Sequence, residues 1–346
     1  MQTSSNRWLV PAVVLAACLP YLQVIPDYFV QDDFGTVYIL TLRPWTMFHK
    51  WFTMPWMESI WGYTPDEIRP FVAFTYQLTG KFAPSRPELH HIFNIAMHAG
   101  NALLVMAIAR AAMGLSPVAA AFAGTVFAVL PSGAESAAWI TGRVDSMPAF
   151  FYLATFLAYV GWRQSGRRAL YAGSLALFFV TLFSKQTAIT MAATLAAYDL
   201  LVLNRRQRGT LLSCVAAWMP FVLMTAGYLL LRRALLGHTV RGGITTWHQV
   251  LTFLGIVERH VYRVTLGHLQ AMTDWEIAAA SAVALLTLVV AVRAGARAVR
   301  FILCFVIAWW WIGAAPVIVA GYESPRHLAR PGSAPDHQSP DQKGVW

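Results

Sequence analysis

Charged side chains are scarce in this chain. They make up only 12% of its 346 residues, whereas 57% are hydrophobic and the mean hydropathy is +0.51. A soluble domain carries about 25% charged residues, so the composition excludes an ordinary soluble protein. Apolar runs of roughly 15–22 residues, about the length that crosses a bilayer, recur along the chain. We therefore predict an all-α polytopic membrane protein, in which the net charge of +10 concerns placement in the membrane and not nucleic-acid binding.

Cysteine is also rare. Cys18, Cys214 and Cys304 lie in three different apolar segments and have no metal-binding spacing, which argues against a disulfide framework. No segment repeats at a fixed period. The first apolar run has a thin charged leader and no clear cleavage site, so we interpret it as a retained first helix.

The apolar runs predict a bundle of about nine transmembrane helices. They cover roughly residues 8–25, 91–110, 117–131, 146–162, 169–183, 187–203, 211–231, 275–292 and 301–320. Four short basic turns then share one side, around Arg110 and within 163–168, 205–208 and 293–300. The positive-inside rule makes that side cytoplasmic, together with the N-terminus, and we expect the protein in the inner (cytoplasmic) membrane.

The stretch 169–203 is too long for one span, because a straight helix of that length would measure about 50 Å. We predict a break at FSKQT, which places Lys185 at the outer surface.

Three segments lie on the outer, periplasmic side of this topology. The long first outer loop, 26–90, is aromatic-rich and too polar to span, so we expect interfacial helices there. The second outer turn covers 131–145. The basic outer loop, 232–274, carries several arginines, for which phosphate binding is one explanation. A transmembrane domain of residues 1–328 is followed by a polar tail, 329–346, that is predicted to be disordered.

An acidic pair, Asp32 and Asp33 in VQDDFG, follows the first span. Two adjacent carboxylates do not both ionise freely unless a cation or hydrogen-bond donors compensate them. A helix cap, a general base and a metal ligand are all compatible with this pattern.

Four polar residues of the second span share one helical stripe: His91, Asn94, His98 and Asn101. Polar groups in lipid usually face the interior of a bundle. Hydrogen bonding between helices explains His98 and Asn101. His91 and Asn94 lie nearer the outer surface and are candidates for substrate binding.

Glu135, Arg143 and Asp145 crowd the otherwise apolar turn GAESAAWITGRVD. Arg143 and Asp145 either pair with each other or bind a substrate. Glu135 has no partner nearby in the sequence, so it is a candidate for substrate or metal binding.

Two further cations lie at the outer end of the predicted helical bundle. Lys185 is flanked by the hydroxyl side chains of Ser184 and Thr187, which suits an anion such as phosphate, although snorkelling to the interface is the alternative. Arg69 precedes the second span and is either a phosphate ligand or an ordinary surface arginine.

Six segments in this order carry a resemblance to a known family: QDDF (31–34), RPFVAFTYQL (69–78), LHHIFNIAMHAGNALL (89–104), PSGAESAAWITGRVDSM (131–147), LFSKQTAI (182–189) and ESPRHL (323–328). The chain resembles the polytopic GT-C glycosyltransferases. Within them it is most similar to the bacterial relatives of the transmembrane and tetratricopeptide-repeat protein O-mannosyltransferases.

The resemblance implies a GT-C-like membrane glycosyltransferase with a polyprenyl-phosphate-linked hexose or mannose as donor. It implies that Asp32 or Asp33, with Asp32 favoured, either deprotonates the acceptor hydroxyl or holds a divalent cation, Mg or Mn. The donor phosphate would be met by some of Arg69, Lys185, Arg143 and the basic outer loop 232–274. The acceptor would be a protein or a glycan, and the implied stereochemical course is single-step inversion.

Three features depart from the family pattern. Gln186 stands where an acid is expected, Leu130 precedes Pro131 where a histidine is usual, and the chain is short after ESPRHL. Two alternatives therefore stay open. One is a transporter or flippase of a lipid-linked or anionic substrate, and the other is an inactive, truncated glycosyltransferase. The gathering of charge on one face, without an inverted repeat, favours the enzyme.

Overall fold

The computed structural model describes residues 5–57, 67–130, 133–203, 209–239, 289, 293 and 297–320. Within these ranges every regular element is a helix, as the composition predicted. The elements are η1 (Ser5–Trp8), α1 (Leu9–Cys18), η2 (Leu19–Val24), α2 (Asp32–Leu42), α3 (Met47–Lys50), α4 (Pro70–Phe82), α5 (Pro87–Ala111), α6 (Pro117–Val129), α7 (Ala134–Ala138), η4 (Ile140–Gly142), α8 (Arg143–Ser165), α9 (Arg168–Leu182), η5 (Gln186–Thr190), α10 (Met191–Leu201), α12 (Leu211–Leu236) and α15 (Arg297–Ala320).

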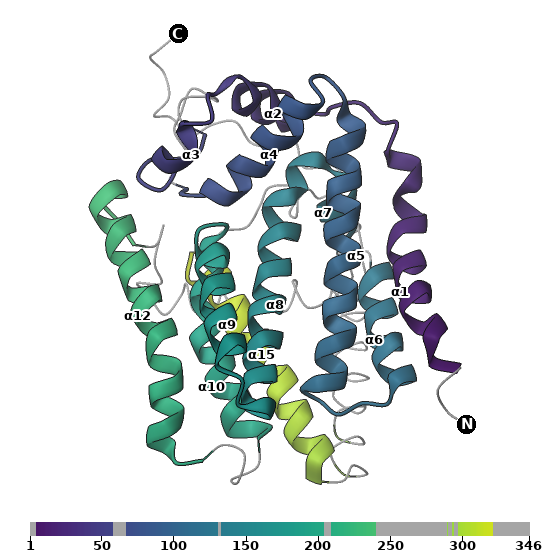
Figure 1. Ribbon diagram of the computed structural model, residues 1–346, viewed down its shortest axis with the longest axis vertical. Helices are drawn as coiled ribbons and strands as arrows, with labels where there is room; N and C mark the ends of the chain where they lie inside the picture. The colour runs from purple at the N-terminus through teal and green to yellow at the C-terminus, as the bar shows by residue number, and fades with distance from the viewer. Residues whose placement is uncertain are drawn as a thin grey trace, which may run out of the picture.

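The long helices stand side by side as a bundle, and α2, α3 and α4 lie across one end of it (Figure 1). This end also carries α7 and the beginning of α8. The helix α8 is central, because it packs against both α5 and α9. We call the end with α2–α4 the upper end of the bundle.

Prolines begin three of these helices. Pro70, Pro87 and Pro117 occupy the first positions of α4, α5 and α6, where the missing N–H leaves no bond unmade and the fixed φ suits a helix. Ser116 also caps α6, since its hydroxyl accepts a hydrogen bond from a backbone N–H of the first turn.

Three of the described helices are long and apolar enough to cross a membrane: Pro87–Ala111, Ile140–Ser165 and Leu211–Leu236. Four shorter apolar helices accompany them, at Leu9–Val24, Pro117–Val129, Arg168–Leu182 and Ile302–Gly313. These features support a membrane protein. The count of about nine spans stays a prediction, and its eighth span, 275–292, lies outside the described residues apart from Val289.

The predicted break between 169 and 203 is present. The helix α9 ends at Leu182, and η5 begins only at Gln186. The backbone N–H groups of Ser184 and Lys185 both donate to the carbonyl of Thr181, each at 3.0 Å, so the chain turns at the predicted place.

The outer segments are more helical than their names suggest. The first outer loop holds α2, α3 and α4, while their interfacial depth remains a prediction. The basic outer loop does not begin at 232, because α12 continues to Leu236 and includes Arg232 and Arg233. The rest of that loop from 240 onward, and the tail 329–346, lie outside the described residues.

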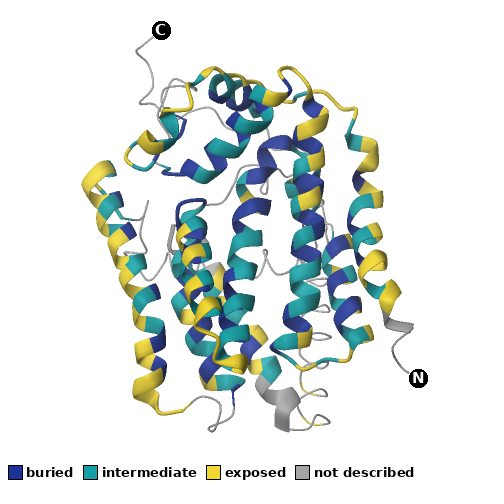
Figure 2. Cartoon of the chain, viewed as in Figure 1, coloured by how far each residue is buried: buried dark blue, intermediate teal, exposed yellow. Residues whose placement is uncertain are grey.

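An aromatic cluster fills the space among the helices from α8 to α15. Six of its aromatic residues are at most 1% exposed: Phe156, Tyr159, Phe178, Tyr198, Phe221 and Phe305. Close packing is the main source of helix association in lipid, because lipid tails are as apolar as the side chains they replace. Buried residues accordingly line the facing sides of α5 and α8, whereas exposed residues run along α12 (Figure 2).

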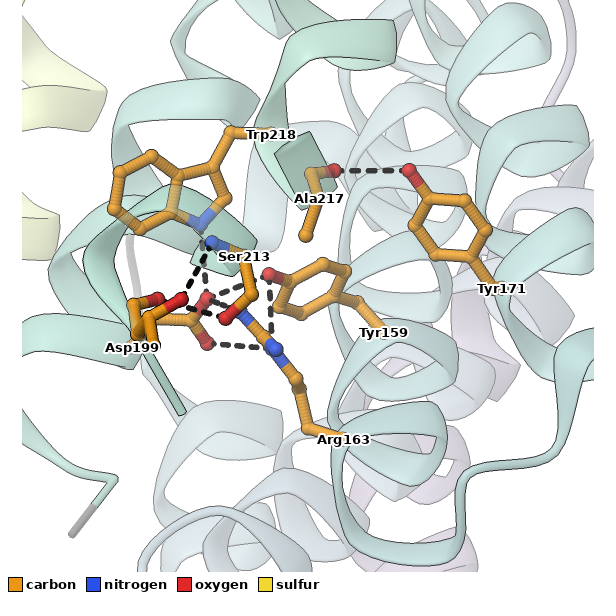
Figure 3. Close-up of polar contacts among 8 residues, drawn as sticks. Tyr159, Arg163, Tyr171, Asp199, Ser213, Ala217 and Trp218 are labelled. Atoms are coloured by element: carbon orange, nitrogen blue, oxygen red, sulfur yellow. Dashed lines mark hydrogen bonds and ion pairs between the residues drawn. The ribbon is translucent and has the colours of Figure 1, made fainter. Parts of the chain in front are cut away.

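A buried ion pair lies near the end of α8 that is far from α2. Asp199 is 0% exposed, and its Oδ1 accepts from Arg163 Nε at 3.1 Å. Its Oδ2 accepts from the same guanidinium, from the Tyr159 hydroxyl at 2.7 Å and from Trp218 Nε1 at 2.9 Å (Figure 3). The carboxylate therefore joins α8, α10 and α12.

This ion pair gives a stability prediction. Replacing Asp199 with Ala leaves the Arg163 guanidinium buried without its counter-ion, which costs about 3–5 kcal/mol in comparable cases. We expect a clear drop in the thermal unfolding midpoint of the detergent-solubilised protein, followed by tryptophan fluorescence.

The matched control is Asp145→Ala, which breaks the ion pair between Asp145 and Lys185. The Asp145 side chain is 53% exposed. Exposed pairs contribute about 0–1 kcal/mol, so this variant is expected to unfold close to wild type. Equal losses in the two variants would contradict a special contribution from the buried pair.

Candidate functional site

The acidic pair sits on a tight turn at the start of α2. Asp33 N donates to Val30 O at 3.0 Å, and Val30 N donates to Asp33 Oδ2 at 3.1 Å. Gln31, between them, has a φ of 47°. Such a conformation costs a residue other than glycine about 1–3 kcal/mol and persists only where its surroundings hold it.

Asp33 is anchored by a residue 108 positions away. Its Oδ1 accepts two hydrogen bonds from Thr141, one from the backbone N at 2.9 Å and one from Oγ1 at 2.6 Å. The side chain is almost fully buried, since the residue is 1% exposed. Burial raises the pKa of Asp33, and the hydrogen bonds from Thr141 and Val30 and the nearby His91 oppose that rise.

Asp32 differs from its neighbour in exposure. It lies on the same turn but is only partly buried. Neither aspartate caps α2, since the N-cap residue is Gln31 and no side chain makes a capping bond there. Both lie in the first turn, where the helix dipole favours negative charge. The helix-cap interpretation of the acidic pair is therefore wrong.

Arg143, the first residue of α8 and two positions after Thr141, is 0% exposed. Its Nε donates to Asn94 Oδ1 at 3.1 Å, its Nη1 to Thr79 Oγ1 at 3.2 Å and its Nη2 to His90 O at 3.3 Å. Its guanidinium also lies over the ring of Tyr76, at 4.4 Å. Arg143 does not pair with Asp145, and its placement favours support of the site over contact with a phosphate.

Asn94 connects Arg143 to the segment that carries Thr141. While its Oδ1 accepts from Arg143, its Nδ2 donates to Trp139 O at 2.8 Å and to Ile140 O at 3.0 Å. The amide is thus satisfied within the protein. Asn94 positions the backbone next to Thr141, and nothing in this geometry leaves its amide open to a substrate.

The whole polar stripe of α5 is buried, as predicted. His91 Nε2 lies 3.2 Å from Asp27 O, and His98 Nε2 lies 2.9 Å from Ala128 O. Asn101 Nδ2 donates to Ser146 O at 2.9 Å. The inter-helix bonding expected for His98 and Asn101 is confirmed, and His91 makes a similar contact.

Sequence reasoning missed three members of the network, Thr79, His90 and Tyr76. His90 is 0% exposed, with Nδ1 at 3.0 Å from Thr79 Oγ1. Tyr76 donates its hydroxyl to Ile140 O at 3.0 Å, and burial raises its pKa. His90 adjoins the predicted His91, and Tyr76 lies within the segment RPFVAFTYQL (69–78), which were the available signals, whereas nothing marked Thr79.

The predicted cations form a second group at the same end. Lys185 is ion-paired with Asp145. Arg69 donates to Glu67 Oε1 at 2.8 Å and lies 5.7 Å from the Trp56 ring centre. These three predicted residues, Lys185, Asp145 and Arg69, are therefore in contact with groups of opposite charge.

Arg232 joins this group from α12. It donates to Gln186 Oε1 at 3.3 Å and to Thr239 O at 3.2 Å. Gln186, the residue that stands in place of an expected acid, is thus its neutral acceptor. Arg69 lies close by, because the charges of both Arg69 and Arg232 act on Tyr228, one turn before Arg232.

Glu135 is an exposed residue in the first turn of α7. Among the described residues no group of three or more His, Cys, Asp and Glu side chains is placed to hold a metal ion. The oxygens of Asp33 already accept three hydrogen bonds. The described side chains therefore do not fit a divalent cation held by the protein alone.

Comparison with known proteins finds relatives of this chain, although no family model matches it. It is 27% identical over 179 residues to the protein O-mannosyl-transferase TMTC4 of Homo sapiens, covering 43% of this chain and 24% of that protein. It is 33% identical over 168 residues to Tmtc2 of Drosophila melanogaster, covering 42% and 17%. For TMTC1 of Homo sapiens the values are 27% over 209 residues, 56% and 23%.

The chain is similar to the TMTC protein O-mannosyl-transferases. The predicted resemblance is therefore confirmed. Each match spans less than a quarter of the relative's length.

Gly142 gives a prediction about the anchor of Asp33. A Cβ atom at this position would lie 2.5 Å from Glu135 O and 2.8 Å from Ser136 Cα. Gly142→Ala must therefore push α7 away from the segment that carries Thr141. We expect a loss of about 1–3 kcal/mol, the usual range for overpacking, seen as a lower thermal unfolding midpoint.

Gly173→Ala in α9 is the matched control, because a Cβ there meets nothing within 4 Å. It is expected to leave stability unchanged or raise it by up to about 1 kcal/mol. If Gly142→Ala behaved like Gly173→Ala, the close packing at Gly142 would be disproved.

Proposed function

We propose that this chain is a membrane glycosyltransferase that transfers a sugar from a polyprenyl-phosphate donor to an acceptor hydroxyl. The relatives are named protein O-mannosyl-transferases, which suggests a mannosyl or other hexosyl donor and a protein acceptor. We place the reaction on the outer face of the cytoplasmic membrane, at the upper end of the bundle. The observation that carries the proposal is the acidic turn at the same end as a group of cations, where the charges of Asp33 and Arg69 both act on Tyr76.

Asp32 is the proposed general base. Asp33 is 1% exposed and its oxygens are engaged by Thr141 and Val30, so an incoming hydroxyl has little access to it. Asp32 is partly exposed on the same turn. In the proposed step Asp32 takes the hydroxyl proton, the acceptor oxygen bonds to the anomeric carbon, and the bond from that carbon to the phosphate breaks.

The leaving phosphate departs with the electron pair of the broken bond and needs positive charge nearby. Arg69, Lys185 and Arg232 are the described cations that we assign to it. Lys185 forms an ion pair with Asp145, and Arg69 forms one with Glu67. A bound phosphate would compete with these two carboxylates for the cations. Arginine suits this role because its planar fork matches phosphate oxygens.

The proposal is tested with purified protein in nanodiscs, loaded with radiolabelled polyprenyl-phosphate hexose and an acceptor peptide. Asp32→Asn keeps the size of the side chain but removes the base. Release of free lipid phosphate is expected to fall about 100-fold or more, the scale for loss of a general base. Thermal unfolding should stay near that of wild type.

Glu88→Gln, an equivalent change at an exposed carboxylate in the first turn of α5, serves as the control and should retain activity. An active Asp32→Asn enzyme would reject Asp32 as base. No release by the wild type with any donor would reject the glycosyltransferase proposal itself.

We further propose that transfer needs no divalent cation, because the charge of the leaving phosphate is assigned to Arg69, Lys185 and Arg232. Initial rates of lipid-phosphate release are expected to be the same after dialysis against EDTA and after addition of Mg or Mn. If EDTA abolished activity and Mg or Mn restored it, the proposal would be rejected. A divalent cation, in place of the arginine and lysine side chains, would then neutralise the leaving phosphate.

A further inference from the structure

The turn that carries Asp32 is held in a conformation it does not prefer. Gln31 has φ 47° and ψ −116°, a region that favours glycine. The turn is closed at both ends by bonds between Val30 and Asp33, one from backbone to backbone and one to the Asp33 side chain. Its shape therefore depends on where the Asp33 carboxylate is fixed.

Thr141 supplies that fixed point. Both of its donors, the backbone N–H and the hydroxyl, bind the same carboxylate oxygen at 2.9 and 2.6 Å. The Thr141 backbone is itself rigidly seated. The preceding carbonyl, that of Ile140, accepts from both Asn94 and Tyr76, and Gly142 packs tightly against α7.

We propose that Thr141 is a positioning residue: by holding the Asp33 carboxylate, it keeps the strained Val30–Asp33 turn in the form that presents Asp32 to the acceptor hydroxyl. The proposal rests on the function proposed above. Thr141 itself touches no reacting atom in it. Its effect passes through Asp33 to the backbone of Asp32.

The test compares Thr141→Val with Thr141→Ser. Valine keeps the branched shape and the backbone N–H but removes the hydroxyl, whereas serine keeps both donors. In the nanodisc assay we expect Thr141→Val to lower kcat about 10- to 100-fold with little change in donor KM, as misplacement of a reacting group does. Thr141→Ser should restore most of the rate.

Thr155→Val is the matched control. Thr155 is 0% exposed in the same helical segment, Ile140–Ser165, and its hydroxyl donates to Phe151 O, one turn earlier in the same helix. It should leave kcat near wild type. Equal losses of kcat in Thr141→Val and Thr155→Val would reduce Thr141 to a general stabilising residue and overturn the proposal.

A second readout does not depend on activity. A spin label is attached to Gln31→Cys, at an exposed position, in a background in which Cys18, Cys214 and Cys304 are alanine. Thr141→Val is expected to increase the mobility of this label, and Thr155→Val is not.

Suppose that Thr141→Val increases the mobility of the label but the wild-type protein transfers no sugar. This result would reject the proposed function while leaving the anchoring of the turn by Thr141 intact. Unchanged mobility together with unchanged kcat would overturn the positioning role while leaving the proposed function standing. If Thr141→Val does not fold, Thr141→Ser and the label in the unsubstituted background decide: a freely mobile label there would overturn the proposal.

Discussion

A buried guanidinium must have its N–H groups satisfied inside the protein, and the arrangement around Arg143 follows from that requirement. Asn94, Thr79 and His90 supply the acceptors. Because Asn94 accepts from Arg143 with its oxygen, its amide nitrogen is left to hold the carbonyls of residues 139 and 140. That fixes Thr141, which in turn fixes Asp33. The acidic turn is thus tied to one buried charge.

Much of the fold could be predicted from the sequence, because its signals are local. Scarce charge and long apolar runs indicate membrane helices, and the spacing of His91, Asn94, His98 and Asn101 identifies the inward face of α5. The break at Lys185 follows from the length of the stretch and from the lysine in its middle. Each of these inferences needs only neighbouring residues and the dimensions of a bilayer.

The pairings within the site could not be predicted in this way. Asp33 and Thr141 are separated by 108 positions, and nothing near either residue marks the other. Arg143 has Asp145 two residues away, yet that carboxylate pairs with Lys185. Arg163 reads as part of a basic turn but pairs with Asp199, 36 residues later. The partner of each of these charged side chains is determined by tertiary packing and not by proximity in the sequence.

The Arg163–Asp199 pair also bears on how the protein is made. The ribosome delivers Arg163 before its counter-ion exists, since two helices must be synthesised between them. An unpaired arginine is expensive within lipid. We therefore expect Arg163 to become buried in the bundle only after α10 has been synthesised and has brought Asp199 to it.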